Sequence, residues 1–407
     1  MSKLVKSALI NEILIPLIGL CVTLSLFLSQ PDVNKTLWLR RFFIYVAGGL
    51  SLLALIYMSK QIKLIKRASL ILELLTAIST ISLFMSKPLV WGIIGQPIIH
   101  PGLLSLYASI LIGLVFAVSP DKKNIYKGFY ALLVVFTVIN LVYWLTHGLD
   151  SRLGFLGVQL NYTAYLTVIG LIIGIWAYSN RIFPIYLIYL SQLTLLVSAL
   201  LTQSRVAILL ALASFILFVY ILVKDHYKVT ALLALTILIS LLAVVRCSSS
   251  FDRVHNQSYL NTSVTYRLDL IKASIPVHLN KLILGGGVGS LEHNIGTNGQ
   301  NYTPIKKDLK AGWKFESSHN YVVDILVERG VVVLILYIAF ITYALKQGLR
   351  SSNNEQKLLL FLLLATLIFW FFNNINIQAE LIMWGSIIGL LTRTSHKDLS
   401  TSKLKIT

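Results

Sequence analysis

The sequence predicts an all-α polytopic membrane protein with about twelve transmembrane helices, and three observations support this fold class. Hydrophobic residues make up 56% of the 407 residues and charged residues only 13%, about half the charged share of a soluble domain. Apolar runs long enough to cross a hydrocarbon core of about 30 Å recur along the whole chain. The alternation typical of a transmembrane barrel is absent from the sequence, so we expect helices throughout.

Twelve apolar runs, most of them separated by short polar connectors, predict the individual spans. The first run is too long for the apolar part of a cleavable signal and lacks a clear small-residue cleavage site, so we expect it to remain as a span. Together the runs predict one membrane domain over residues 1–407. The predicted spans are 8–28, 40–58, 68–86, 102–119, 128–147, 160–178, 182–201, 205–223, 229–246, 330–346, 357–374 and 378–392.

One connector is different: residues 247–329 form a long polar loop between the ninth and tenth predicted spans. Loops of this length without much structure are usually functional. It contains helical-looking pieces such as Thr265 to Ile275, a glycine-rich turn with the sequence LGGGVGS, and the polar run EHNIGTNGQNYT. We therefore expect this loop to carry part of the active site.

The positions of the basic residues predict the topology. With the N-terminus in the cytoplasm, nineteen of the 35 Lys and Arg residues fall in inside segments and six in short outside connectors and helix ends. This asymmetry follows the positive-inside rule and places both termini in the cytoplasm and the long loop outside, in the periplasm or extracellular space. Much of the formal net charge of +19 then faces anionic lipid, and we expect no nucleic-acid partner.

Three outward-facing arginines are candidate anion ligands. Arg205 follows Ser204 in LLTQSRVAILLAL, where a helix N-terminus meets the outer leaflet; Arg267 lies in the long loop, and Arg152 in the connector DSRLGFLGVQLNY. Each could instead be an interface anchor or a solvated charge. A helix N-terminus favours an anion, and a guanidinium adds bidentate phosphate geometry. The combination suits the diphosphate of a lipid-linked sugar donor at the membrane surface.

His319, in the stretch SSHNYVVDILVERG, is the candidate proton handler. A free imidazole titrates near working pH, so it could accept a proton from a sugar hydroxyl; the alternative is a helix cap or a packing residue. We expect Glu316 and Asn320 to be close enough in sequence to orient the ring. Asp324 and Glu328 share another helix face, so we expect them to be surface charges or partners of other basic residues.

Metal and cofactor sites are not expected. The histidines are scattered and no clustered carboxylates are present, unlike metal-dependent phosphoryl and glycosyl enzymes. The turn GGGVG lacks the G-K-[ST] ending of a nucleotide loop, so we expect a tight turn that lets backbone or glycan approach closely. Glu12 and Glu73 lie in apolar spans and favour a second class of function, a transporter of lipid-linked glycans, although no internal repeat supports it.

Four segments carry a resemblance to a known family: LTQSR around Arg205, residues 266–290, residues 317–333, and residues 152–166. The chain resembles the O-antigen ligase and O-antigen polymerase (Wzy_C-like) superfamily of bacterial envelope glycosyltransferases. The resemblance implies a GT-C-like membrane fold in the bacterial inner membrane, an undecaprenyl-diphosphate-linked glycan as donor, and metal-independent transfer to an acceptor hydroxyl with inversion. It places Arg205 and Arg267 on the family's pyrophosphate-binding arginines and His319 on its catalytic histidine.

One position departs from the ligase pattern of this superfamily. His319, Asn320 and Gly330 fit it, but Val333 stands where ligases tend to carry Gly, Thr or Tyr. Ligase and polymerase differ in the acceptor, which is a lipid A–core sugar of lipopolysaccharide for a ligase and the growing polysaccharide chain for a polymerase. We favour the ligase-like reading and keep the polymerase as the alternative.

Overall fold

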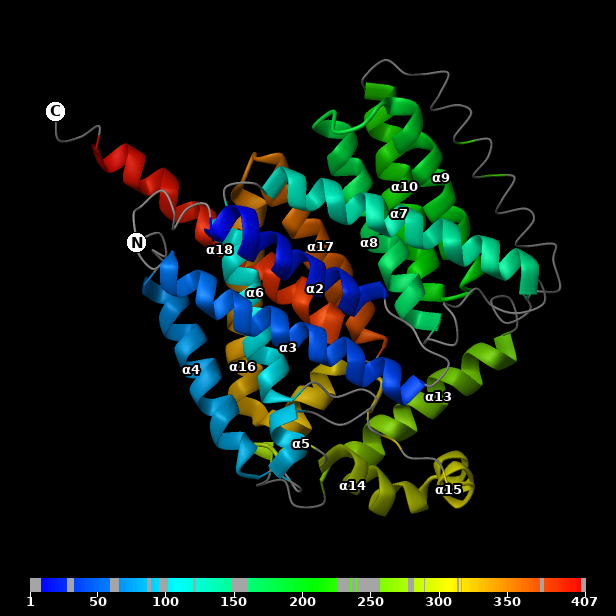
Figure 1. Cartoon of the computed structure of the whole chain (residues 1–407). Coiled ribbons are helices and arrows are strands. Elements are labelled where there is room, and N and C mark those ends of the chain that lie inside the picture. Colours follow the sequence, from blue (N-terminus) through cyan, green and yellow to red (C-terminus); the bar gives the residue numbers. More distant parts are fainter. Residues whose placement is uncertain are drawn as a thin grey trace. The chain divides into compact units, whose positions relative to one another are not determined.

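Helices account for every regular element in the described part of the computed structural model, which confirms the all-α prediction. The structure describes residues 9–27, 33–58, 66–85, 89–94, 102–119, 122–147, 160–224, 235, 239, 257–276, 282–288, 290–312, 315, 317–373 and 377–403. In chain order (Figure 1) the elements are η1 (Leu9–Leu14), α2 (Ile15–Phe27), α3 (Val33–Tyr57), α4 (Lys66–Leu83), α5 (Leu89–Ile94), α6 (Leu103–Val118), α7 (Lys122–His147), α8 (Leu160–Ser179), α9 (Ile185–Leu201), α10 (Arg205–Lys224), α13 (Gln257–Ser274), α14 (Ser290–Asn298), η4 (Gly299–Asn301), α15 (Thr303–Lys310), α16 (Tyr321–Arg350), α17 (Asn354–Phe371) and α18 (Ile377–Lys403).

The described helices are those of a multi-pass membrane protein. Six of them are long and apolar enough to cross a bilayer, and five shorter apolar helices accompany them within the described residues. The count of about twelve spans and the GT-C-like fold stay predictions. Of the predicted span 229–246, only residues 235 and 239 lie inside the described part of the chain.

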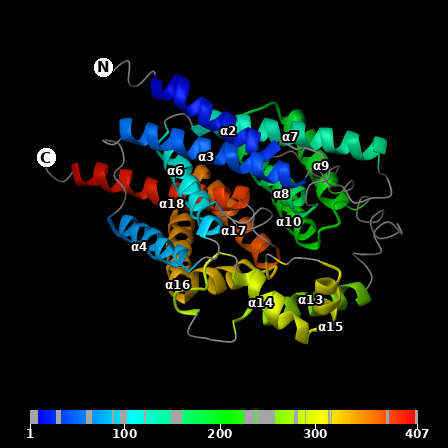
Figure 2. The same cartoon turned by 60° about the horizontal axis from the view of Figure 1, so that its bottom comes forward.

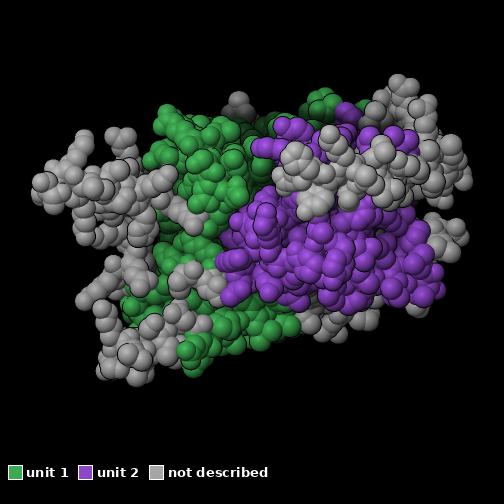
Figure 3. All heavy atoms as spheres, turned by 90° about the horizontal axis from the view of Figure 1, so that it is seen from above, with its two compact units in different colours: residues 1–28, 34–122, 265–407 green, residues 29–33, 123–264 purple. Residues whose placement is uncertain are grey.

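The chain divides into two compact units, which Figure 3 colours separately. Unit 1 comprises Met1–Leu28, Asn34–Lys122 and Thr265–Thr407, and unit 2 comprises Ser29–Val33 and Lys123–Val264. In unit 1, α6 and α18 pack closely because Gly113 lets the backbone of Gly385 approach its Cα. In unit 2, α8 packs against both α9 and α10 and is largely buried. The single membrane domain stays a prediction.

Helix α16 is broken at Gly330, the residue at which the sequence predicts the tenth span to begin. Gly330 has φ 88° and ψ 168°, so a shorter helix over residues 321–329 precedes the longer apolar one. The carbonyls of Val327 and Glu328 are accordingly available, and they accept hydrogen bonds from the N–H groups of Gly286 (2.8 Å) and Gly287 (2.9 Å). The GGGVG turn therefore serves close backbone approach, one of the two roles expected from its sequence.

The long loop has a small core of its own. Within unit 1, Leu270 of α13 packs with Ile295 of α14 and Ile305 of α15, and Tyr266 and Phe315 cover this cluster. The three helices lie side by side in both views (Figures 1 and 2). The polar run 292–303 contributes three further hydrogen bonds, because its Asn294 and Asn298 side chains donate to the carbonyls of residues 273–275 at and just past the end of α13. The helix expected over residues 265–275 is thus present, within α13.

The contact between Gly285 and Gly330 predicts a sharp stability effect. A Cβ on Gly330 would lie 2.4 Å from the Ile283 carbonyl oxygen, and one on Gly285 would lie 2.3 Å from that of Glu328. Both residues also have positive φ, which costs a non-glycine residue about 1–3 kcal/mol. Gly330→Ala and Gly285→Ala should each lower the free energy of unfolding by more than this strain alone, measured by thermal unfolding in detergent.

Gly296→Ala is the matched control for these variants. Gly296 lies within α14 and a Cβ there meets nothing within 4 Å, so the change should be neutral or stabilising by about 0.5–1 kcal/mol. Wild-type stability in Gly330→Ala would contradict the assigned break in α16.

Candidate functional site

The segment that holds His319 is fixed by a buried carboxylate. Asp324 is 2% exposed and accepts hydrogen bonds from the hydroxyls of Ser317 (2.7 Å) and Ser318 (2.6 Å) and from the Ser318 N–H (2.9 Å). The N-cap of α16 is Asn320, whose side-chain oxygen accepts from the N–H groups of Val322 and Val323. This cap starts the helix, and Asp324 draws the preceding serines back over its first turn.

The expectation of surface charges is wrong for both Asp324 and Glu328, whereas the other expectation, a basic partner, is confirmed for Glu328, whose carboxylate interacts electrostatically with Arg329. The two acids are 2% and 3% exposed. Helix-face spacing could not show that the segment before α16 folds back, where Ser317 and Ser318 cover Asp324. Asp324 nevertheless acts on His319 indirectly, because the His319 N–H donates to the Ser317 hydroxyl (3.0 Å) that Asp324 holds.

His319 adopts an unusual backbone conformation, with φ 61°, in a region that non-glycine residues rarely occupy. Such strain at a functional position is kept only when neighbouring contacts enforce it. Its side chain is partly exposed, but the Nδ1 atom is buried and has no hydrogen-bond partner among the described residues. The Nδ1 atom is therefore a buried polar atom whose hydrogen bond the described residues do not supply.

Arg267 and the His319 segment meet at the C-terminal end of α17. The guanidinium of Arg267 donates to the Phe372 carbonyl (2.8 Å), and the Asn320 amide donates to the adjacent Phe371 carbonyl (3.2 Å). The last carbonyls of a helix have no partners within the helix and carry partial negative charge. Asn373 satisfies a third one, that of Phe369 (3.0 Å). One helix end thus positions both predicted site residues.

The electrostatics of this arrangement keep the imidazole neutral. Burial is the main cause that lowers the pKa of His319, from 6.5 to about 4, and the positive charge of Arg267 is the second. At neutral pH the ring accepts hydrogen bonds without carrying charge. A lowered pKa makes the ring a weaker general base than a free imidazole.

A buried ionic network lies in the same unit and was missed by sequence reasoning. Arg329 lies 3.9 Å from Glu380, which is completely buried, and donates to the Tyr337 hydroxyl (2.8 Å). The Tyr321 ring, next to Asn320 in the chain, packs on Trp370 with centroids 4.6 Å apart. A signal for Glu380 existed, because an acid inside an apolar segment indicates a buried partner. No such signal existed for Arg329, because this residue falls at the end of the predicted polar loop 247–329.

Glu12 and Glu73, the two acids that favour the transporter alternative, do not lie inside the helix bundle. Glu12 and Glu73 are both exposed on the surface of unit 1. This position suits side chains that reach toward water at the membrane surface. It gives the transporter hypothesis no internal charged path through Glu12 or Glu73.

The remaining predicted site residues either belong to unit 2 or lie outside the described residues. Arg205 is the first residue of α10 in unit 2, as expected of a helix mouth, and follows the turn 202–204. Ser204 is 7% exposed, and its N–H donates to the Thr202 hydroxyl (3.3 Å). Arg152 and Glu316 lie outside the described residues. The meeting of Arg205 with Arg267 and His319 stays a prediction.

The fold and the site define a multi-pass helical membrane protein with a neutral histidine and a fixed arginine at one helix end. Residues 190–338 match the family model Wzy_C, described as O-antigen ligase. This match confirms, over these residues, the resemblance to the O-antigen ligase family that the motifs indicated. This region includes Arg205, Arg267 and His319, and the match supports a ligase- or polymerase-type glycosyltransferase. No curated protein matches the chain.

The neutral state of His319 can be tested directly. Diethyl pyrocarbonate modifies only neutral imidazole, so His319 should stay reactive as the pH falls through 6.5 and should lose reactivity only near pH 4, followed by peptide mass spectrometry. Arg267→Gln should move the midpoint upward, because it removes the second cause of the lowered pKa. A wild-type midpoint at 6.5, or one unmoved in Arg267→Gln, would contradict this electrostatic account.

Proposed function

We propose that this protein is an O-antigen ligase-like glycosyltransferase. The acceptor oxygen, from a lipid A–core sugar hydroxyl, forms a bond to the anomeric carbon of the donor glycan. The bond from that carbon to the diphosphate oxygen breaks, and undecaprenyl diphosphate leaves with the electron pair. Attack from the face opposite the leaving group gives inversion. The acceptor proton passes to the departing diphosphate, and the reaction takes place at the outer face of the bacterial inner membrane.

The proposal rests above all on the shared helix end that holds Arg267 and the His319 segment within the matched region. The Arg267 guanidinium would stabilise the charge that develops on the departing diphosphate, and Arg205 and Arg152 would add further phosphate contacts. The neutral His319 ring would accept a hydrogen bond from the acceptor hydroxyl and aim it at the anomeric carbon. Asn320 supports the ring as the cap of α16; Ser204 and Glu316 keep their supporting roles as predictions.

A polysaccharide polymerase is the second candidate, because Val333 departs from the ligase pattern. Val333 is completely buried within α16. A side chain in that position acts on helix packing rather than on the acceptor, so the departure leaves the ligase reading open. The two functions share the donor chemistry and differ only in which hydroxyl is presented.

A transfer assay with purified protein separates the candidates. The reaction contains undecaprenyl-diphosphate-linked glycan and a metal chelator, with lipid A–core or a second glycan donor as the acceptor. Sugar on lipid A–core supports the ligase, and chain extension supports the polymerase. Movement of the lipid-linked glycan across a vesicle membrane without bond formation would identify a transporter. Loss of transfer on chelation would contradict metal independence.

The arginines and His319 give the first mutational prediction. Arg205→Ala and Arg267→Ala should each lower transfer by about 10²- to 10³-fold, and Arg→Lys should recover little because the bidentate fork is lost. His319→Ala should lose turnover and keep donor binding. Arg350→Ala, an exposed arginine at the end of α16, is the control. Wild-type turnover in any of the first three alanine variants removes that residue from the site.

Asp324 gives a second prediction, as a positioning residue. Asp324→Ala releases the serines that hold His319, so kcat should fall about 10- to 100-fold while KM for the donor stays unchanged. Asp324→Asn keeps one acceptor oxygen and should restore part of the rate. Adding Ser317→Ala to Asp324→Ala should cost nothing further. Additive losses, or a fall in thermal stability that accounts for the lost rate, would show a general structural role instead.

A further inference from the structure

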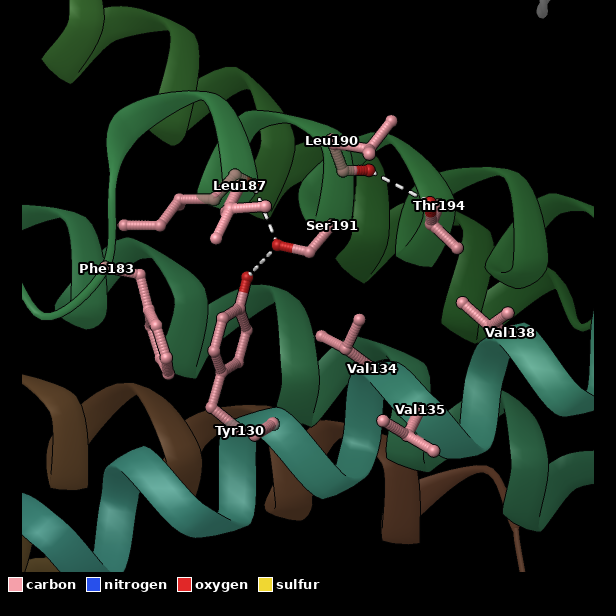
Figure 4. A pocket seen from close by; sticks show the side chains of 11 residues that line it. Tyr130, Val134, Val135, Val138, Phe183, Leu187, Leu190, Ser191 and Thr194 are labelled. Carbon is pink, nitrogen blue, oxygen red and sulfur yellow. Dashed lines mark hydrogen bonds between the residues drawn. The ribbon is translucent and has the colours of Figure 1, made fainter.

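A groove runs between α7 and α9 in unit 2, remote in sequence from the His319 segment. Its cavity volume is about 290 Å3, and Figure 4 shows aliphatic side chains from both helices pointing into it. Val134, Val135 and Val138 come from α7, and Leu187 and Leu190 from α9. At one end the Tyr130 and Ser191 hydroxyls are hydrogen-bonded to each other. The groove is therefore mostly apolar, with the paired Tyr130 and Ser191 hydroxyls at one end.

The dimensions fit a single hydrocarbon chain. Tyr130, Val134 and Val138 are four residues apart on one face of α7, so the groove extends about 12 Å along that helix at 1.5 Å per residue. One leaflet contributes about 15 Å to the hydrocarbon core of a bilayer. The volume lies at the lower limit of ligand sites, which suits one acyl chain rather than a whole lipid.

The polar end of the groove is basic. The Lys127 ammonium lies 5.5 Å from the centroid of the Phe183 ring, and Phe183 lines the groove. Lys127, Lys123 and Arg181 are all exposed. The described residues of unit 2 contain no Asp or Glu, so this part of the chain supplies no acid to neutralise these three cations. Their charge complements an anionic headgroup.

We propose that this groove binds an anionic glycerophospholipid, with one acyl chain between α7 and α9 and the phosphate at Lys127. Each exposed cation near a membrane surface attracts anionic lipid, and the apolar groove adds selectivity for a lipid chain over a soluble phosphate. The site is separate from the proposed donor site. Phe183 precedes the first turn of α9, whereas Arg205 follows its last turn, so the two cationic sites lie at opposite ends of this helix.

Native mass spectrometry of the full-length protein tests the proposal with phosphatidylglycerol and phosphatidylcholine of identical acyl chains. The protein should retain more phosphatidylglycerol than phosphatidylcholine, and the ratio of the two should be about fivefold for each cation that contacts the phosphate. Lys127→Gln should reduce this preference by about fivefold and leave phosphatidylcholine retention unchanged. Because Lys127 is exposed, this variant keeps the fold and isolates the charge.

A groove-filling variant tests the apolar part. Val134→Trp should lower retention of both lipids, and Val142→Trp, on the same helix but outside the groove and 54% exposed, should not. Thermal unfolding of both variants confirms that they are folded. Equal retention of the two lipids by wild type, or identical behaviour of the two Trp variants, would show annular lipid only and overturn the proposal. Displacement by undecaprenyl phosphate in preference to phosphatidylglycerol would overturn the choice of occupant.

Discussion

The arrangement of unit 1 depends on which groups hydrogen-bond to the backbone of α16 where the helix breaks. A polar backbone group left unpaired in an apolar surrounding costs several kcal/mol, so a helix can be interrupted there only if other groups replace its hydrogen bonds. At Gly330 the replacement comes from Gly286 and Gly287 of the long loop. Because Gly285 and Gly330 have no Cβ, the two backbones approach closely enough for this exchange. The loop is thereby joined to the apolar helix, and the preceding helical segment 321–329 has a fixed start at the His319 segment.

Two kinds of buried polar contact stabilise the structure around this break. Asp324 accepts three hydrogen bonds and sets the shape of the segment before α16. Arg329 and Glu380 join α16 to α18, where a charge left unpaired would be costly. The positive charge of Arg267 contributes to keeping His319 neutral. A site of this kind suits a reaction that needs a fixed cation and an uncharged hydrogen-bond acceptor next to each other.

Unit 2 brings different chemistry to the chain. It supplies Arg205 at the start of α10, after the last turn of α9. Near the first turn of α9 it supplies the apolar groove with basic residues at its polar end. Charge of one sign without acids in the described part of this unit is poorly suited to internal ion pairs. It is well suited to phosphate groups, whether of a donor diphosphate or of a bilayer lipid. The same composition that sets the topology of a membrane protein therefore also predicts where anions bind.

The sequence by itself determined the helical membrane class, the resemblance to the O-antigen ligase family and the helix start at Arg205, because these follow from run length and local motifs. It predicted the tenth span to begin at 330, where α16 breaks, since the apolar run begins at this glycine. Only the tertiary structure showed that Asp324 and Glu328 are buried, that the α17 carbonyls hold Arg267 and Asn320, and that Glu380 pairs with Arg329. The contacts of Arg267, Asn320 and Arg329 join residues between 51 and 105 positions apart, so they depend on how helices pack. Helical periodicity predicts which face of one helix is apolar, but it does not predict which other helix packs against that face.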